Sequence, residues 1–514
     1  MSTQIPSKCP LNAAPFSVAQ VSKPAVSRVS KPAWRMAALP TWKSATQQVW
    51  KPALRSGGAT LLLLLLLLLL SLSARAATRP DIVIILADDL GYGDLACYGA
   101  PSTRTPNLDR MACEGLKFTD FYVAAAVCTP SRAGLLTGRL PIRSGMAGSA
   151  ENSVLMASST GGLPTNEITI AAALKTAGYA TACIGKWHLG HLPEYLPTHH
   201  GFDYFDGVRF ANNMEPAKGV KRPPQPIASL NPKREWWHMA LLRGTEIIEA
   251  DTDPYTLTAR YTAEALKFIK ENRSRPFFLY FAHTYPHAPL FASEKFQKRS
   301  ARGLYGDVVE ELDWSVGEVF KTLREEGLST NTLVFFTSDN GPALNLKLAG
   351  GSAGQLRGGK GSTWEGGTRE PAIAWWPDKI QPGAVTHELA CSLDLFNTCV
   401  GLAGAPMPAD RPMDGVDLAP LLLRGEGSAR KLIFYYHRDH LFAVRKGVYK
   451  AHFIAPPGEA AKTPFNHPPP YLFQVQNDPG ELLDIAAEHP DVVADLQREF
   501  EQHKKEAVPG KSQY

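Results

Sequence analysis

From residue 81 onward, short apolar runs alternate with segments whose apolar residues recur at helical spacing. The runs "DIVIILADD", "RPFFLYFAH" and "NTLVFFTSDNG" predict buried strands, because they are short, continuous and rich in β-branched and aromatic residues. The segment "TIAAALKTAGYATACIGKW" predicts a helix that stops at Gly178 and leads into another strand. This alternation is typical of an α/β fold with a central sheet.

Two helices between these strands have clear boundaries in the sequence. In "TPNLDRMACEGL", Thr105 is the expected N-cap and Pro106 the first helical residue, the position where a missing N–H does no harm. The second helix is expected to end at Gly327, since glycine commonly terminates helices. Its apolar positions follow helical spacing and are Val308, Leu312, Val316, Val319 and Leu323.

The composition of the chain changes at two places beyond residue 200. Residues 207–240 are rich in Pro, Asn and Lys and predict an irregular insertion over one face. Near residue 405 the linker-like stretch "GAPMPADRPMDG" is followed by the shorter runs "KLIFYYH", "HLFAVRKGVYKAHFIA" and "YLFQVQN", which predict a small antiparallel sheet. We therefore divide the chain into a leader (1–77), a main α/β domain (78–428) and a C-terminal antiparallel-sheet subdomain (429–514).

The net charge of +5 comes from the leader. Residues 1–77 hold nine Lys and Arg and no acidic residue, which leaves 54 − 9 = 45 basic against 49 acidic residues in the body. A body of net charge −4 gives no indication of a nucleic-acid surface.

The leader contains ten consecutive leucines followed by Ala74-Arg75-Ala76. This pattern predicts a signal peptide cleaved near Ala76 and export to a periplasmic, secreted or lysosome-like compartment. The apolar run is shorter than the ~20 residues of a membrane span, so we expect no stable span, with an uncleaved signal anchor as the alternative. Met1 and Met36 are both candidate start residues.

Cysteine usage excludes two classes of protein. Six of the seven cysteines follow the leader, and no CxxC pair occurs, so neither a disulfide scaffold nor a zinc site is indicated. Exported protein could form one or two disulfides. Asn272-Arg273-Ser274 is a glycosylation sequon if the host glycosylates.

Acidic and amide side chains follow two of the predicted strands. Asp88-Asp89 comes after "IVIILA", and Asp339-Asn340 comes after "LVFFTS". Ligands of open α/β sheets bind beyond the carboxyl ends of strands, so we expect both clusters to face one crevice. Such an all-oxygen set suits a hard cation such as Ca²⁺ or Mg²⁺. The alternative is that these residues only form turns or helix caps.

Several basic residues also lie near predicted strand ends. Lys186 and His188 would share one face of a strand, because side chains alternate with a period of two. Such a pair could bind an anion and exchange a proton. His283 and His287 follow another strand, and Lys360 lies in a Gly-rich loop. Taken singly, each of these residues is more often an ordinary surface or turn residue.

The stretch "VCTPSRAGLLTGR" places Cys128 at or near a helix N-terminus. That end of a helix attracts anions through its free N–H groups and dipole. Arg132 lies one turn further on and can add charge, and Pro130 is tolerated in a first turn. The structural alternative is a buried cysteine in a turn.

These motifs together resemble the sulfatase family. "CTPSRAGLLTGR" matches its C-x-P-S-R-x-x-x-L-T-G-R signature at every fixed position, and "GYATACIGKWH" matches its second signature. Further matches extend the resemblance over most of residues 80–452, and "LLTGRLPIRSGM" and "VYKAHF" are similar to the branch with arylsulfatase A and N-acetylgalactosamine-6-sulfatase. The resemblance implies an alkaline-phosphatase-like fold, with a large central mixed sheet flanked by helices and a smaller C-terminal domain.

The resemblance also implies an activity, hydrolysis of sulfate esters of aryl alcohols, sugars or glycolipids, carried out by residues 78–428. Cys128 would be converted to formylglycine (3-oxoalanine) by a formylglycine-generating or sulfatase-maturating enzyme, and the hydrated aldehyde would supply the nucleophile. One Ca²⁺ per chain would be held by residue 128 together with the acidic clusters, namely Asp88, Asp89, Asp339 and Asn340.

The same resemblance implies roles for the basic residues. Lys186 and Lys360 would bind the sulfate oxygens, and Arg132 would steady the formylglycine and the metal. His287, rather than His283, would also contact substrate and protonate the leaving alcohol. His188 would act on the second hydroxyl of the hydrate. The segment "FDGVRFANNMEPAKG" departs from the family pattern, and Asn213 is our only candidate contact there.

Three other functions compete with this one. A phosphomonoesterase or phosphodiesterase could use the same scaffold, but such relatives have a Ser or Thr nucleophile. A non-catalytic, calcium-stabilised binding protein would result if Cys128 stayed unmodified. A Cys–His hydrolase would leave both acidic clusters without a purpose.

Overall fold

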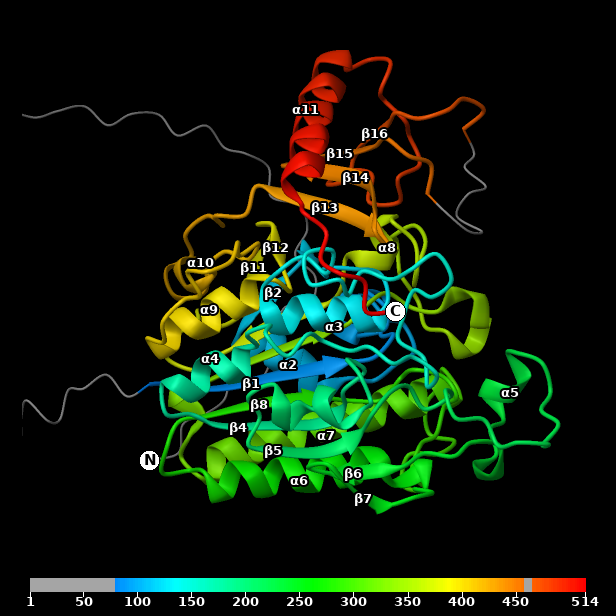
Figure 1. The fold of residues 1–514 in the computed structure, drawn as a ribbon, viewed down its shortest axis with the longest axis vertical. Helices are drawn as coiled ribbons and strands as arrows, with labels where there is room; N and C mark the ends of the chain where they lie inside the picture. The colour runs from blue at the N-terminus through cyan, green and yellow to red at the C-terminus, as the bar shows by residue number, and fades with distance from the viewer. Residues whose placement is uncertain (1–78, 457–464) are drawn as a thin grey trace, which may run out of the picture. The chain divides into compact units, whose positions relative to one another are not determined.

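The computed structural model describes residues 79–456 and 465–514, so the predicted leader lies outside the described residues. A ten-stranded mixed sheet forms its centre (Figure 1). The five central strands run parallel, and their continuous apolar runs are typical of parallel strands buried on both faces. In sheet order they are β9 (Thr332–Ser338), β1 (Asp81–Ala87), β8 (Phe277–Ala282), β4 (Ala180–Lys186) and β5 (Tyr204–Val208).

Shorter strands complete both edges of this sheet. On the β9 side, β10 (Ala372–Trp375) is antiparallel to β9 and β2 (Leu116–Phe118), and β11 (Ala384–Thr386) forms the edge. On the β5 side lie β6 (Leu241–Arg243), which is antiparallel to β5, and β7 (Glu246–Glu249), which is antiparallel to β6. The predicted mixed α/β sheet is confirmed.

Helices cover both faces of the sheet, because alternate side chains of each strand point to opposite sides. Ile82, Ile84 and Leu86 of β1 belong to one apolar core, whereas Val83 and Ile85 belong to the other. The first core contains residues of α3 (Cys128–Thr137), α4 (Ile170–Thr176), α9 (Asp394–Ala403) and α10 (Ala419–Arg424). The second contains residues of α2 (Pro106–Glu114), α6 (Leu257–Glu271) and α7 (Leu304–Glu325).

The helix boundaries agree with the sequence except at one cap. Pro106 is the first residue of α2, but Thr105 makes no capping bond with its side chain. Its hydroxyl instead accepts a hydrogen bond from the Ala96 N–H and donates one to the Asp109 carboxylate. The hydrogen bond from Ala96 therefore takes the place of the expected N-cap hydrogen bond within α2.

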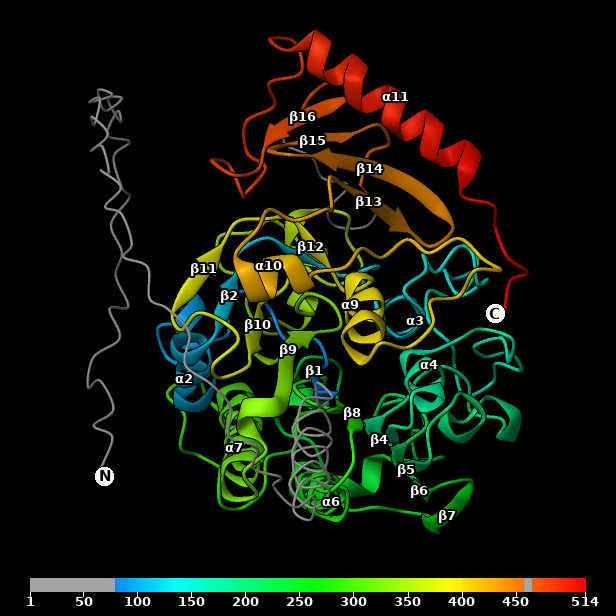
Figure 2. The same cartoon turned by 90° about the vertical axis from the view of Figure 1, so that its left-hand side faces the viewer.

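The predicted C-terminal antiparallel sheet is present as four strands (Figure 2). One face is covered by α11 (Pro490–Glu506), through Leu496 and Phe500. The strands, each paired with the next, are β13 (Leu432–His437), β14 (His440–Lys446), β15 (Tyr449–His452) and β16 (Tyr471–Gln474). Ile433 and Tyr435 of β13 share an apolar cluster with Tyr122, which joins this sheet to the main domain.

The predicted insertion between β5 and β6 contains only α5 (Ile227–Leu230) and a 3₁₀ turn at Arg234–Trp236. Among the described residues, every helix is too short or too polar to cross a membrane.

Candidate active site

The two acidic clusters meet at the carboxyl ends of β1 and β9. These strands are parallel neighbours with Ala87 opposite Ser338, so the residues that follow each strand emerge side by side. The Asp89 N–H donates to Asp339 Oδ1 at 3.2 Å, and Asn340 Nδ2 donates to Asp89 Oδ1 at 2.7 Å. The two clusters therefore lie side by side at one edge of the sheet.

Cys128 is the first residue of α3, as expected, and its side chain is buried. Its thiol lies 3.6 Å from Asp88 Oδ1 and 3.6 Å from Lys360 Nζ. Burial raises the pKa of the Cys128 thiol to about 12, although the nearby charges of Lys186 and Lys360 oppose the shift. The unmodified side chain is therefore a neutral thiol, which is a weak nucleophile. This chemistry argues against the Cys–His hydrolase.

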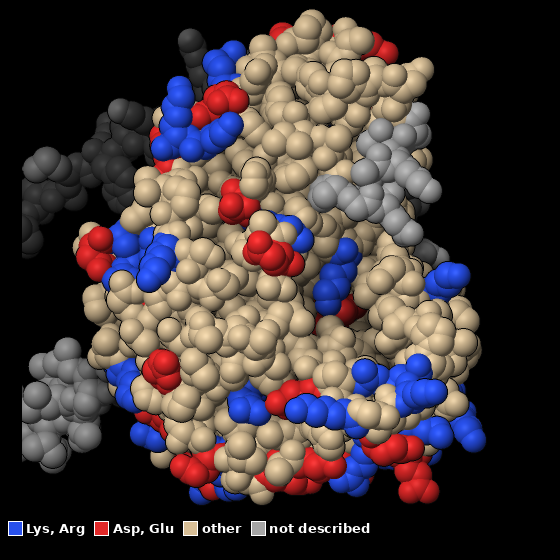
Figure 3. Space-filling view, turned by 45° about the vertical axis from the view of Figure 1, so that its right-hand side comes forward, with Lys and Arg blue, Asp and Glu red and all other residues tan. Residues whose placement is uncertain are grey.

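Each carboxylate of the site has a cationic partner. Lys186 Nζ lies 2.5 Å from Asp88, Lys360 Nζ lies 2.7 Å from Asp89, and an Arg132 guanidinium nitrogen lies 2.8 Å from Asp339. Three negative and three positive charges give a sum of zero. On the face shown in Figure 3, a hollow likewise holds basic and acidic side chains next to each other.

The pKa values of the carboxylates reflect this crowding. Burial alone would raise the pKa of Asp88, but the neighbouring cations, Lys186 first among them, hold it well below its usual range. Burial and the charge of Asp88 raise the pKa of Asp339 to about 6, in spite of Arg132. Asp88 is thus firmly ionised, whereas burial next to the charge of Asp88 makes the ionised form of Asp339 less favourable.

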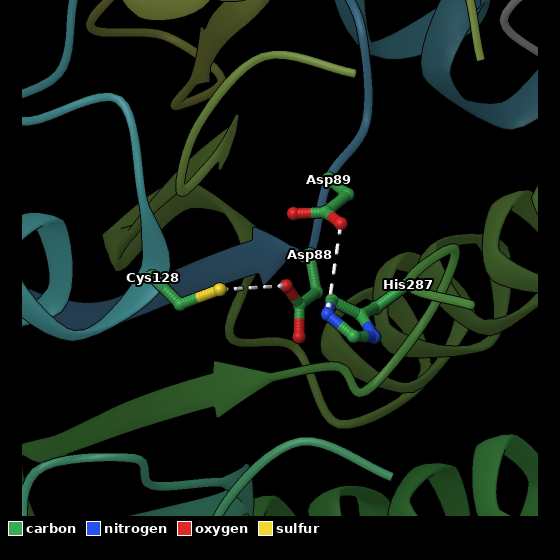
Figure 4. A group of neighbouring side chains, drawn as sticks. All are labelled: Asp88, Asp89, Cys128 and His287. Carbon is green, nitrogen blue, oxygen red and sulfur yellow. Dashed lines mark hydrogen bonds and ion pairs between the residues drawn. The ribbon is translucent and has the colours of Figure 1, made fainter. Parts of the chain in front are cut away.

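The site has the ligands that a hard cation needs. Asp88, Asp89, Cys128 and His287 each offer an atom within 4.8 Å of the others (Figure 4). In addition, the buried Oδ1 of Asn340 has no hydrogen-bond partner among the described residues. An orphaned buried oxygen is costly, and a cation beside the carboxylates would satisfy it. The residues present therefore fit a Ca²⁺ or Mg²⁺ ion.

His287 belongs to the cluster, whereas His283 does not. His287 Nε2 lies 3.7 Å from Asp89, and its Nδ1 lies 3.1 Å from the side-chain amide oxygen Oδ1 of Asn212. Because that oxygen only accepts, Nδ1 carries the proton and Nε2 faces the site. Burial and the Lys360 charge lower the pKa of His287 to about 4. His283 packs on Phe281 and lies 3.5 Å from the Ser315 hydroxyl of α7.

His188 reaches the site differently from the sequence expectation. We expected it to share a strand face with Lys186, but β4 ends at Lys186 and His188 has a φ of +61°. The period-two argument therefore does not apply beyond the strand end. The His188 Nε2 lies 3.0 Å from the Leu155 carbonyl oxygen. Burial and the charge of Lys186 hold the pKa of His188 well below its usual range.

The insertion contributes a residue that the sequence reasoning missed. Our candidate there, Asn213, is exposed, whereas the adjacent Asn212 is buried and bonded to His287. Asn212 Nδ2 also donates to the Pro289 carbonyl oxygen at 2.9 Å, which fixes the amide orientation. The sequence did indicate the pair Asn212-Asn213. It could not show which of the two is buried, because an irregular segment has no helical or strand periodicity.

Comparison with known proteins agrees with this geometry. Residues 80–405 match the family model described as Sulfatase, and residues 428–514 match the C-terminal region of aryl-sulfatase. Arylsulfatase A of Homo sapiens is 45% identical over 447 residues, covering 82% of this chain and 87% of the relative. N-acetylgalactosamine-6-sulfatase of Canis lupus familiaris is 43% identical over 470 residues, covering 86% and 89%.

A solved structure gives the same assignment. A sulfatase from Pseudoalteromonas sp. superposes with a TM-score of 0.74 and 29% identity, covering 86% of this chain and 93% of that one. The chain belongs to the sulfatase family. Its class is therefore that of the sulfuric ester hydrolases, and its fold is the alkaline-phosphatase-like one that the motifs implied.

Proposed function

We propose that this protein hydrolyses sulfate esters of an aryl alcohol, a sugar or a glycolipid to the alcohol and inorganic sulfate, after Cys128 is converted to formylglycine by a maturation enzyme. The observation that carries the proposal is the place of Cys128. It opens α3 inside an intact CxPSR motif, buried between an aspartate and a lysine. The modified side chain, hydrated, would supply an oxygen nucleophile that the neutral thiol lacks.

We propose Ca²⁺ as the cofactor, held by the two acidic clusters and residue 128. The ligands would be Asp88, Asp89, Asp339, Asn340 and the modified Cys128. Bound there, the cation would polarise a sulfate oxygen and favour an ionised nucleophile. The charge of the site would rise from zero to +2, which favours entry of a singly charged sulfate monoester.

Lys186 and Lys360 are the proposed sulfate-binding residues. Their ammonium groups now contact Asp88 and Asp89, and a cation on those carboxylates would leave both lysines available to the substrate. Each can donate hydrogen bonds to oxygens whose charge grows in the transition state. Arg132 stays with Asp339 and the Lys186 carbonyl oxygen and holds this side of the site in place.

We propose that two histidines, His287 and His188, transfer protons. With Nδ1 bound to Asn212, His287 presents Nε2 to the site, and an anionic substrate beside it favours the protonated ring. That ring would donate its Nε2 proton to the leaving alcohol. His188, on the Cys128 side, would accept a proton from the modified residue 128. Such steps typically contribute ~10²–10⁴-fold in rate.

We propose that the leader directs export of the protein to a periplasmic, secreted or lysosome-like compartment. We propose cleavage near Ala76, which lies outside the described residues.

The test compares nitrophenyl sulfate with nitrophenyl phosphate, using protein from a host that makes formylglycine. We expect the sulfate ester to be preferred, calcium chelation to abolish turnover, and added Ca²⁺ to restore it. Cys128→Ala should be inactive, whereas Cys183→Ala, which also removes a buried thiol, should remain active. Preference for the phosphate ester, or full activity in Cys128→Ala, would overturn the proposal.

A further inference from the structure

Residues 142–161, which we name the bracing loop, lie beside the site without regular structure of their own. The chain has no helix or strand between the end of α3 at Thr137 and the start of α4 at Ile170. The loop makes some hydrogen bonds within itself, such as that from the Ser149 N–H to the Asn152 carbonyl oxygen, and others link it to residues outside the loop. Some of these bonds face the site, and others come from the C-terminal region.

On its inner side, the bracing loop contacts the start of α3 and His188 through Leu155. The Leu155 N–H donates to the hydroxyl of Thr129, the residue after Cys128, at 3.2 Å. The Leu155 carbonyl oxygen lies 3.0 Å from His188 Nε2. The Thr129 hydroxyl in turn donates to the His188 carbonyl oxygen at 3.1 Å. One loop residue thus joins the start of α3 to His188.

The Leu155 contact determines which nitrogen of His188 can accept a proton. A carbonyl oxygen only accepts hydrogen bonds, so His188 Nε2 carries the hydrogen of the neutral ring. Nδ1 then holds the lone pair. The buried Nδ1 has no hydrogen-bond partner among the described residues. It is therefore free to act as the base that the proposed function requires.

On its outer side, the bracing loop is held by the turn between β13 and β14. Arg438 donates from Nε to the Ser153 hydroxyl at 3.1 Å and from a terminal nitrogen to the Ala150 carbonyl oxygen. The neighbouring His437 lies 3.1 Å, through Nδ1, from the carbonyl oxygen of Gly361, the residue after Lys360. This turn therefore contacts loops on both sides of the site.

The C-terminal segment Gly510–Tyr514 holds the other end of the bracing loop and passes beside α3 (Figures 1 and 2). The Gly510 and Gln513 N–H groups donate to the carbonyl oxygens of Ile142 and Gly145, at 2.8 and 3.1 Å. The Tyr514 hydroxyl donates to the Met146 carbonyl oxygen at 2.9 Å.

The fit between the two segments is close. A Cβ on Gly145 would lie 1.8 Å from the Lys511 carbonyl oxygen, and one on Gly161 would lie 2.0 Å from that of Gln513. No side chain can occupy such a gap, so the two backbones can lie together only where the loop has glycine.

We propose that Arg438 and Tyr514 are positioning residues for the sulfatase reaction. They hold the bracing loop so that the Leu155 carbonyl oxygen fixes the tautomer of His188 and leaves Nδ1 as the proton acceptor. The inference rests on the proposed function. It adds that the C-terminal sheet and tail take part in catalysis through His188.

The first test measures kcat and KM for Arg438→Ala and Tyr514→Phe, with Arg498→Ala as the control, since Arg498 is an exposed arginine of α11. Misplacing a catalytic group by about 1 Å can cost ~10²-fold. We expect Arg438→Ala to lose about 10- to 100-fold in kcat, with KM nearly unchanged because the lysines stay in place. Arg438→Lys, which keeps one donor, should recover part of the loss. Equal losses in Arg438→Ala and Arg498→Ala would overturn the proposal.

A double-mutant cycle separates positioning from general destabilisation. If Arg438 acts through His188, Arg438→Ala should cost little further activity in a His188→Asn background. Additive losses, or a change in KM alone, would show that Arg438 acts elsewhere.

A measurement without turnover keeps this inference distinct from the proposed function. The His188 Nε2–H proton should give a downfield NMR signal that is absent in His188→Asn and broadened or shifted in Arg438→Ala. If that signal is unaffected by Arg438→Ala, the positioning role is wrong, whatever the activity. If the signal responds but no sulfate ester is hydrolysed, the proposed function fails while the structural link stands.

Discussion

Lys450 of β15 lies at the centre of a buried charge cluster that joins the C-terminal sheet to the loop carrying Lys360. Its side chain is fully buried, and its ammonium group lies 3.1 Å from Glu365, 2.9 Å from Glu481 and 2.8 Å from the Thr363 carbonyl oxygen. Arg369, Arg445 and Asp120 complete the cluster. The charges balance, with three cations and three carboxylates.

Replacing Lys450 by Met would keep most of the side-chain volume and remove the charge. Two buried carboxylates would then share too few cations, and breaking a buried pair in this way typically costs about 3–5 kcal/mol. Residues 79–514 form one compact unit. At about 2 cal/mol/K of unfolding entropy per residue, a unit of this size should lose roughly 3–6 °C in its melting temperature.

The assay is thermal unfolding of purified protein with Lys446→Met as a matched control. Lys446 of the adjacent strand also contacts two carboxylates, Asp495 and Glu499, at 2.9 and 2.7 Å, but its side chain is 40% exposed. Solvent screens such a pair, so its loss should barely change the melting temperature. Adding Glu481→Gln to Lys450→Met should recover part of the stability, because it removes one unmatched charge. Equal shifts in the two single variants would refute the burial argument.

Three further predictions concern stability and modification. Burial lowers the pKa of His503 from near 6.5 to about 4, so its contribution to stability should be lost as pH falls from 6.5 to 4; melting temperatures across that range should fall less in His503→Phe. Burial raises the pKa of Asp81 to about 7, although it accepts the Phe277 N–H. The contribution of Asp81 to stability should therefore be lost as pH rises from 4 to 7. The melting temperature of Asp81→Asn, measured relative to the unsubstituted protein in the same melts, should rise with pH over that range. Asn272 is buried and donates from Nδ2 to the Phe268 carbonyl oxygen at 2.8 Å, so intact mass from a glycosylating host should show no glycan there.

The sequence pattern predicted those parts of the site that regular elements place. Because β1 and β9 are parallel neighbours, Asp88-Asp89 and Asp339-Asn340 had to emerge together, and the apolar runs before them were readable. The position of Cys128 at a helix N-terminus followed from local spacing in the same way.

Residues outside regular elements could not be placed in this way. His188 turns away from the strand direction at a positive φ, and Asn212 lies in an irregular insertion. The Leu155 carbonyl oxygen is a backbone group, so its side chain carries no signal of its contact with His188. The cluster around Lys450 joins residues up to 361 positions apart in number, from Asp120 to Glu481 (481 − 120), and no spacing rule relates them.

The most direct measurement of the central claim is the mass of the tryptic peptide Phe118–Arg132, "FTDFYVAAAVCTPSR", from protein made in its own host. The proposal predicts a peptide with an aldehyde in place of the Cys128 thiol, which a hydrazine reagent traps. A peptide carrying only the free thiol would contradict it, because the site would then have no activated nucleophile.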